Sequence, residues 1–175
     1  MRTVVLRVAA LALLLLLALV AVITVRTLQR IPDTIVYFVQ DRGATFTLEA
    51  AHRRSGATDL RTRVERQVAA LARGPEAQEA ARGLSTAVPS DVAVRDVHLE
   101  GGVLTVDLNA AYERGGGSAS MLGRLYQLYY TLTQPSDVDA VRIAIEGDVI
   151  EMFGGEGLLL DDPWVRADHP ELPVW

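Results

Sequence analysis

The chain contains neither cysteine nor lysine. Without cysteine it can form no disulfide bond and cannot carry a lipid on an N-terminal cysteine. This absence is compatible with a compartment outside the cytoplasm, but it does not establish export. All seventeen basic residues are arginine. We interpret this mainly as the coding bias of a GC-rich genome, since no physical demand would require arginine at every basic site.

A net positive charge is also missing from the part of the chain beyond Ile31. That part carries thirteen arginines and all twenty-two acidic residues, which leaves about nine net negative charges. Nucleic-acid binding needs a basic footprint, so nucleic acid is excluded as the expected partner. One segment is an exception, because its arginines are accompanied only by Asp59 and Glu65: Arg53, Arg54, Arg61, Arg63, Arg66 and Arg73.

This arginine-rich segment allows two interpretations. The simpler one is a solvated helix face and loop, as blocks of charge often are. The other is an interaction patch for an acidic partner or for lipid headgroups, formed by Arg53, Arg54, Arg61, Arg63 and Arg66.

Motifs for catalysis and metal binding are incomplete. No two of the three histidines are spaced for a shared metal ion. The segment 116–120 comes within one residue of the G-x-S-x-G elbow, but Ser120 replaces the last glycine and a glycine-rich loop precedes Ser118. That elbow requires a preceding strand. Ser118 or Ser120 as a helix cap is therefore the better interpretation, and Ser118 as a hydrolase nucleophile is the weaker one. We expect no catalytic residue, no cofactor and no metal.

The longest feature that is present is an unbroken apolar run from Val8 to Val25, with two arginines on either side. Such a run in a helix approaches the roughly 30 Å hydrocarbon thickness of a bilayer. Cleaved signals have shorter apolar regions and a small-x-small cleavage site. We therefore expect residues 1–30 to form an uncleaved signal-anchor helix. The arginine distribution slightly favours a cytoplasmic N-terminus, which places the remainder outside the cytoplasmic membrane.

Residues 31–153 are expected to form one domain, followed by a tail of residues 154–175 that contains Trp164 and Trp175. Whether this tail packs on the domain is left open. The hydrophobic periodicity predicts an α+β fold in which one layer of mostly antiparallel sheet is packed by two helices. The expected strands are 34–39, 45–51, 92–99, 103–108, 141–145 and 149–153, and the expected helices begin near residues 60 and 118.

Four segments in this order resemble the GerMN domain family, which is named after a bacterial spore-germination protein. They are Val36–Phe38; Leu71–Pro75 with Gly83–Pro89; Gly102–Asn109 with Tyr112; and Tyr130–Gln134 with Val141–Gly147. The resemblance implies a non-catalytic module outside the cytoplasmic membrane, similar in shape to the ring-building domains of envelope-spanning assemblies. It carries over no catalytic residue. Many relatives are lipoproteins and some carry two copies of the domain, whereas this chain lacks cysteine and shows one copy. A role in sporulation does not follow from the family name.

These observations favour a membrane-anchored protein-interaction module that helps to assemble an envelope complex, through an envelope protein partner or through self-association. A free sheet edge and the arginine patch are the expected contact surfaces. The alternative is a domain that binds wall glycan or peptide through Asp107, Tyr112 and Trp164, with Tyr126 as a further stacking residue. For Asp107 we prefer a structural role beside a turn.

Overall fold

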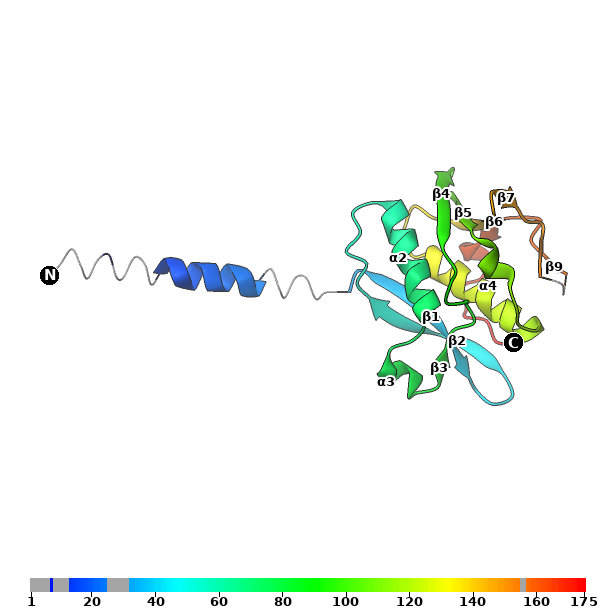
Figure 1. Ribbon diagram of the computed structural model, residues 1–175, viewed down its shortest axis with the longest axis horizontal. Helices are drawn as coiled ribbons and strands as arrows, with labels where there is room; N and C mark the ends of the chain where they lie inside the picture. Colours follow the sequence, from blue (N-terminus) through cyan, green and yellow to red (C-terminus); the bar gives the residue numbers. More distant parts are fainter. Residues whose placement is uncertain (1–6, 8–12, 25–31, 155–156) are drawn as a thin grey trace. The chain divides into compact units, whose positions relative to one another are not determined.

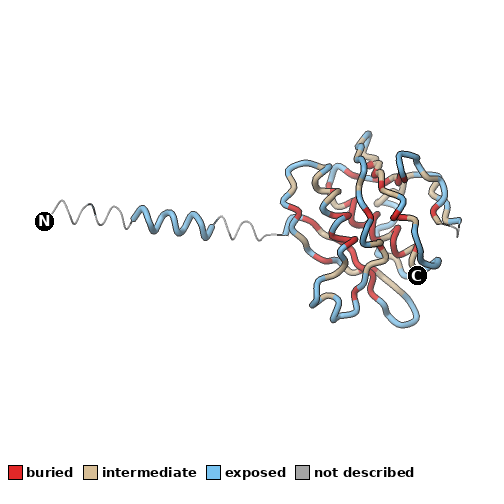
Figure 2. Tube along the Cα trace, in the orientation of Figure 1, coloured by how far each residue is buried: buried red, intermediate tan, exposed pale blue. Residues whose placement is uncertain are grey.

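The computed structural model describes residues 7, 13–24, 32–154 and 157–175 (Figure 1). The chain divides into two compact units, Met1–Pro32 and Asp33–Trp175. In the first unit, residues 13–24 are helical, and every large apolar side chain from Leu13 to Ile23 is at least half exposed (Figure 2). Within the described residues, no helix has both the length and the apolar character needed to cross a bilayer. Both ends of the expected anchor lie outside the described residues.

The first sheet of the second unit is built on strand β1 (Thr34–Asp41), which pairs antiparallel with β2 (Phe46–Arg53) and with β3 (Leu84–Ser85) in the order β2-β1-β3. The β1 sequence is rich in β-branched and aromatic residues, which favour a strand. Most of its side chains are buried, including Val36 and Phe38 at 0% exposure. The first predicted hairpin is therefore confirmed.

The second sheet has the order β10-β6-β5-β4, and β7 also pairs with β6. The predicted hairpin of β4 and β5 is confirmed, but β5 runs parallel to β6. Because the strands divide into separate sheets, the expected single layer is wrong. A whole helix lies between β5 and β6 and returns the chain to the same end of the sheet, which makes the two strands parallel. These strands are β4 (Val94–Glu100), β5 (Val103–Leu108), β6 (Ala140–Ile145), β7 (Asp148–Val149) and β10 (Trp164–Val165).

Two longer helices pack on these sheets. Helix α2 (Leu60–Arg73) begins near residue 60, as predicted, and follows Asp59, whose carboxylate accepts a hydrogen bond from the Thr62 N–H at 2.8 Å. Helix α4 (Ser118–Leu132) has Gly117 as its N-cap, so the prediction of a serine cap is wrong. Gly117 takes the extended backbone of an N-cap, and the helix begins one residue earlier than a Ser118 cap would allow. The shorter elements are α3 (Ala77–Ala80), β8 (Met152–Phe153), β9 (Leu158–Leu159), η1 (Ala110–Glu113) and η2 (Arg166–Asp168).

Helix α4 is buried along most of its length, and it carries polar side chains into the interior. The Thr131 hydroxyl accepts the Tyr37 N–H at 3.0 Å, and the Gln127 amide donates to the Tyr37 carbonyl at 3.0 Å. The Arg124 guanidinium, 2% exposed as a residue, donates to the carbonyls of Ala87, Tyr112 and Gly115. Its burial lowers the pKa of Arg124 from the ordinary value.

We expect Arg124→Met to lower the free energy of unfolding by about 3 kcal/mol, because three buried or partly buried carbonyls lose their donor. Arg73→Met is the matched control, since Arg73 is exposed at the end of α2, and it should change the free energy by less than about 0.5 kcal/mol. Urea unfolding followed by tryptophan fluorescence measures both. Equal losses in the two variants would contradict the anchoring role of Arg124.

Candidate functional site

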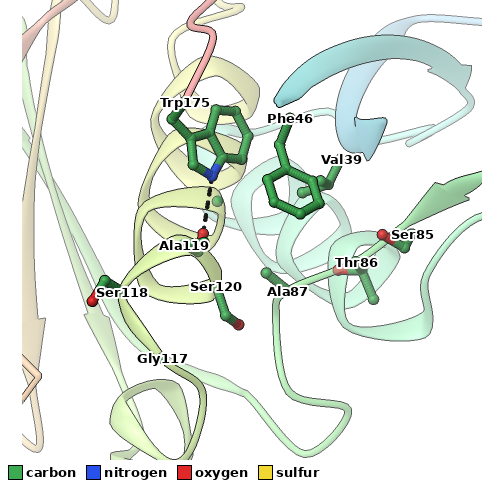
Figure 3. Close-up of a pocket in the computed structure, with 11 residues that line it drawn as sticks. Val39, Phe46, Ser85, Thr86, Ala87, Gly117, Ser118, Ala119, Ser120 and Trp175 are labelled. Atoms are coloured by element: carbon green, nitrogen blue, oxygen red, sulfur yellow. Dashed lines mark hydrogen bonds between the residues drawn. The ribbon is translucent and has the colours of Figure 1, made fainter. Parts of the chain in front are cut away.

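A cavity of about 540 Å³ lies between the first sheet and the N-terminal half of α4 (Figure 3). Its apolar surface comes mainly from β1, β2 and the tail. Its hydroxyl groups come from the segment after β3 and from the start of α4. The lining residues are Val39, Phe46, Ser85, Thr86, Ala87, Gly117, Ser118, Ala119, Ser120, Gly123 and Trp175.

One wall of this cavity is held by side chains of α4. The Ala87 N–H donates to the Gln127 side-chain oxygen at 2.7 Å, and the Ala87 carbonyl accepts from Arg124 Nε at 2.9 Å. The Thr86 hydroxyl donates to the Leu71 carbonyl at 2.8 Å, which ties the same segment to α2. The wall is an irregular segment whose backbone groups are satisfied by side chains, as burial requires.

The opposite side of the cavity is closed by the tail, which pairs with the first residues of β2. Phe46 and Trp175 exchange two backbone hydrogen bonds, at 2.9 and 3.1 Å, and Val174 lies opposite Thr47 in antiparallel register. The Thr47 hydroxyl donates to the Pro173 carbonyl at 2.9 Å. The tail therefore packs on the domain as a short added strand.

The Trp175 indole is fixed by this pairing and lies against the start of α4 (Figure 3). Its Nε1–H donates to the Ala119 carbonyl at 3.0 Å, and its ring contacts the rings of Phe46 and Tyr126. A Cβ at Gly123 would lie 3.1 Å from the indole and 3.3 Å from the Val39 side chain. The absence of a side chain at Gly123 is therefore what lets the indole approach the helix.

The cavity is lined by apolar groups and hydroxyl groups. Among the described residues that line it, no side chain is a carboxylate, an imidazole or a guanidinium. No group of three or more acidic or histidine residues in the described part of the chain could hold a metal ion. Apolar surface with a few hydroxyl groups is typical of a site that recognises a peptide or a sugar.

The predicted arginine patch is only partly assembled. Arg53, Arg54 and Arg66 line a second cavity of about 330 Å³ between β2 and α2, together with Arg73. Arg61 instead pairs with Glu65 at 2.9 Å and with Asp96 of β4 at 2.7 Å, and Arg63 does not line this cavity. No local pattern in the sequence predicts that carboxylates from distant segments approach these arginines.

Arg53 is the clearest example, because its guanidinium donates two hydrogen bonds to the Glu79 carboxylate. This hydrogen bonding lowers the pKa of Glu79 below its ordinary value of 4.5, against the opposing effect of burial. The same pair raises the pKa of Arg53. A large part of the Arg53 charge is therefore already neutralised within the domain.

The predicted ligand contacts Asp107, Tyr112 and Trp164 do not form one site. Asp107 accepts the Gly147 N–H at 3.0 Å and pairs with Arg95 at 3.5 Å, so it braces a turn. Tyr112 is fully buried, which removes its ring from any ligand. The Trp164 ring is stacked on Tyr129 and on His169, at centroid distances of 5.1 and 4.8 Å, so these stacks occupy ring surface that a ligand would need.

Comparison with known proteins places this geometry in a family. The family model "Germane: Sporulation and spore germination" matches residues 35–151, about two thirds of the chain. The chain belongs to this family. The predicted resemblance to GerMN domains is thereby confirmed. Curated proteins give no significant match.

Solved GerMN structures share the fold. The first GerMN domain of the sporulation protein GerM from Bacillus subtilis aligns with a TM-score of 0.63 at 18% identity, over 77% of this chain and 98% of that one. The tandem GerMN domains of the same protein give 0.58 at 20% identity, over 75% of this chain and 43% of that one. A candidate lipoprotein from Clostridium perfringens gives 0.54 at 15% identity, over 80% and 95%. This chain thus spans less than half of the tandem protein, and identities this low establish the fold alone.

Several residues that line or support the 540 Å³ cavity were not predicted from the sequence. Trp175 and Gly123 were not among the predicted contacts, and neither were the polar residues of α4. Arg124, Gln127 and Thr131 recur at intervals of three and four residues within an otherwise apolar helix. That spacing puts them on one face, and it was the available signal for a buried polar column.

We expect Gly123→Val to push the Trp175 indole away from α4 and to loosen the tail. The amide hydrogen of Phe46, which donates to the Trp175 carbonyl, should then exchange with solvent at least tenfold faster. Hydrogen exchange of this amide, followed by NMR, is the measurement. Gly117→Val is the matched control, because a Cβ there meets nothing within 4 Å. Equal acceleration in both variants would contradict the packing role of Gly123.

We expect the Arg53–Glu79 pair to stabilise the GerMN domain above about pH 4.5 and to stop doing so on acidification, because the folded pKa of Glu79 is depressed. Glu79→Gln should cost about 2 kcal/mol near pH 7, because both side chains of the pair are mostly buried. The difference from the parent chain should shrink as the pH falls through the folded pKa. Urea unfolding at a series of pH values measures this. A difference that stays constant with pH would contradict an ionic contribution.

Proposed function

We propose that this chain is a non-catalytic protein-interaction module of the bacterial cell envelope, anchored in the cytoplasmic membrane by residues 1–30. The GerMN domain of residues 31–153 and the tail of residues 154–175 then lie outside the cytoplasm. Partner binding, through an envelope protein or through self-association, is the activity that we assign to it. No nucleic acid is involved.

The observation that carries this proposal is the extended segment bound beside the cavity. An edge strand that accepts an extended segment, next to an apolar pocket that takes one of its side chains, is a recurrent way in which proteins recognise one another. The apolar side chains and hydroxyl groups of the described lining suit the binding of such a segment. Two features support location at a membrane: the exposed apolar side chains of residues 13–24, and the likeness to a candidate lipoprotein.

The same cavity supports one alternative, the binding of wall glycan or peptide. Two aromatic rings, Phe46 and Trp175, lie near four hydroxyl groups, and this combination suits a sugar. The hydroxyl groups belong to Ser85, Thr86, Ser118 and Ser120. Trp164 is a poorer candidate for such stacking, because its ring already stacks on Tyr129 and His169.

Photo-cross-linking in intact cells tests the proposal. A photoreactive amino acid at Ser85, which is exposed at the rim of the cavity, should capture a defined envelope protein or a second copy of the chain. The same group at the exposed Asp148 of β7, which does not line this cavity, is the control and should capture neither. Protein capture that was equal at both positions, or absent from both, would contradict an interaction site at the cavity.

Two further variants separate the competing surfaces. Binding of purified wall fragments that is lost in Trp175→Ala, without protein capture at Ser85, would favour the wall-binding alternative. Replacing Arg61, Arg63 and Arg66 by Glu together tests the arginine patch. Partner capture that was unaffected by this replacement would eliminate the patch as a contact surface.

A further inference from the structure

The segment Leu172–Trp175 is held against β2 in the way that a separate peptide would be. Its backbone forms two hydrogen bonds with Phe46, and the Pro173 carbonyl accepts from the Thr47 hydroxyl. The Trp175 side chain then inserts between Phe46, Tyr126 and the glycine face of α4. Backbone pairing combined with one anchoring side chain is the mode of strand addition.

Apart from the indole, this segment buries few side chains against the domain that carries it. Leu172 and Val174 are 39% and 68% exposed. The residues just before it, His169 to Glu171, are exposed as well, and the Tyr130 hydroxyl donates to the His169 and Glu171 carbonyls at 3.3 and 2.6 Å. Segments with few buried side chains open at a fraction of the global free energy of unfolding. The surface on β2 is therefore accessible through local opening.

The fit of the tail also leaves space unfilled. The cavity of about 540 Å³ continues beside the indole, toward Ser85 and the start of α4. A segment that arrives from another chain, at a different entry angle, can make the same backbone bonds and reach this space as well. The site thus does not require that the bound strand belong to the same chain.

We propose that the segment Leu172–Trp175 exchanges between copies, so that the tail of one chain adds to β2 of a second chain and places its Trp175 in the second chain's cavity. This exchange rests on the proposed function, and it identifies the binding partner as a second copy of the chain. A second copy is favoured because the chain's own segment already matches the site in backbone register, in hydrogen bonding and in the indole pocket. Confinement of anchored copies to one membrane raises their effective concentration and favours the exchanged state.

The absence of native cysteine makes a disulfide test selective. Phe46 and Trp175 exchange both of their backbone bonds, so the neighbouring pair Thr47 and Val174 is of the non-hydrogen-bonded type. Such pairs have Cα atoms about 4.5 Å apart, within the range of a disulfide. Cysteines at these two positions should therefore join only when a tail is docked on β2.

The experiment mixes two full-length variants in the membrane or in detergent, one Thr47→Cys and the other Val174→Cys, with tags of different mass. Under mild oxidation we expect a mixed disulfide dimer. Its yield should be at least tenfold above that of a mixture of Thr47→Cys with Val149→Cys. Val149 is the matched control, because it is an exposed valine of β7 that does not pair with β2. Adding Trp175→Ala to the Val174→Cys chain should lower the yield about tenfold.

The double variant Thr47→Cys/Val174→Cys, kept dilute, shows whether the pairing itself is correct, since it should close an intramolecular disulfide. If it closes while the mixed dimer stays at the level of the Val149→Cys control, the tail remains on its own chain and the exchange proposal is overturned. If it does not close, the pairing is wrong and the proposal also falls. Capture of a different envelope protein at Ser85 would, in either case, leave the proposed function standing.

Discussion

The structure depends on the polar side chains that α4 carries into the interior. A buried guanidinium or amide is unfavourable unless its hydrogen bonds are satisfied. Arg124 finds its partners in the connections between elements, and Gln127 bonds both to the segment after β3 and to strand β1. Arg124 gathers three carbonyls from two different connections, and Gln127 joins β1 to the segment after β3. Helix position, loop conformation and the first sheet are therefore coupled, and none of them can shift without leaving a buried group unpaired.

The cavity follows from this coupling. Because α4 holds the segment at Ala87 through both backbone groups, this segment forms a fixed wall of the cavity. Gly123, one residue before Arg124, leaves the helix surface open at the same level. The Trp175 indole takes part of that opening, and the edge of β2 aligns the tail that carries it. The same buried network that stabilises the GerMN domain thus shapes the surface on which a partner strand is proposed to dock.

The predicted arginine patch carries less unpaired positive charge than the sequence indicated. Arg53 and Arg61 are paired with carboxylates from other elements, and the exposed Arg61–Asp96 pair adds little stability. Solved structures share the fold at 15–20% identity, so these likenesses establish the architecture and leave the contact residues of this chain to be found in its own geometry.

The sequence by itself determined the local elements: the apolar run, the β1–β2 and β4–β5 hairpins, the start of α2 near residue 60, and the family. These elements depend on patterns that span a few consecutive residues, and a single sequence displays such patterns directly. Only the tertiary structure decided the parallel pairing of β5 with β6, the pairing of Arg53 with Glu79, the burial of Tyr112 and the docking of Trp175. Each of these joins segments far apart in the chain, and no local pattern records which distant group will satisfy a given hydrogen bond or fill a given space.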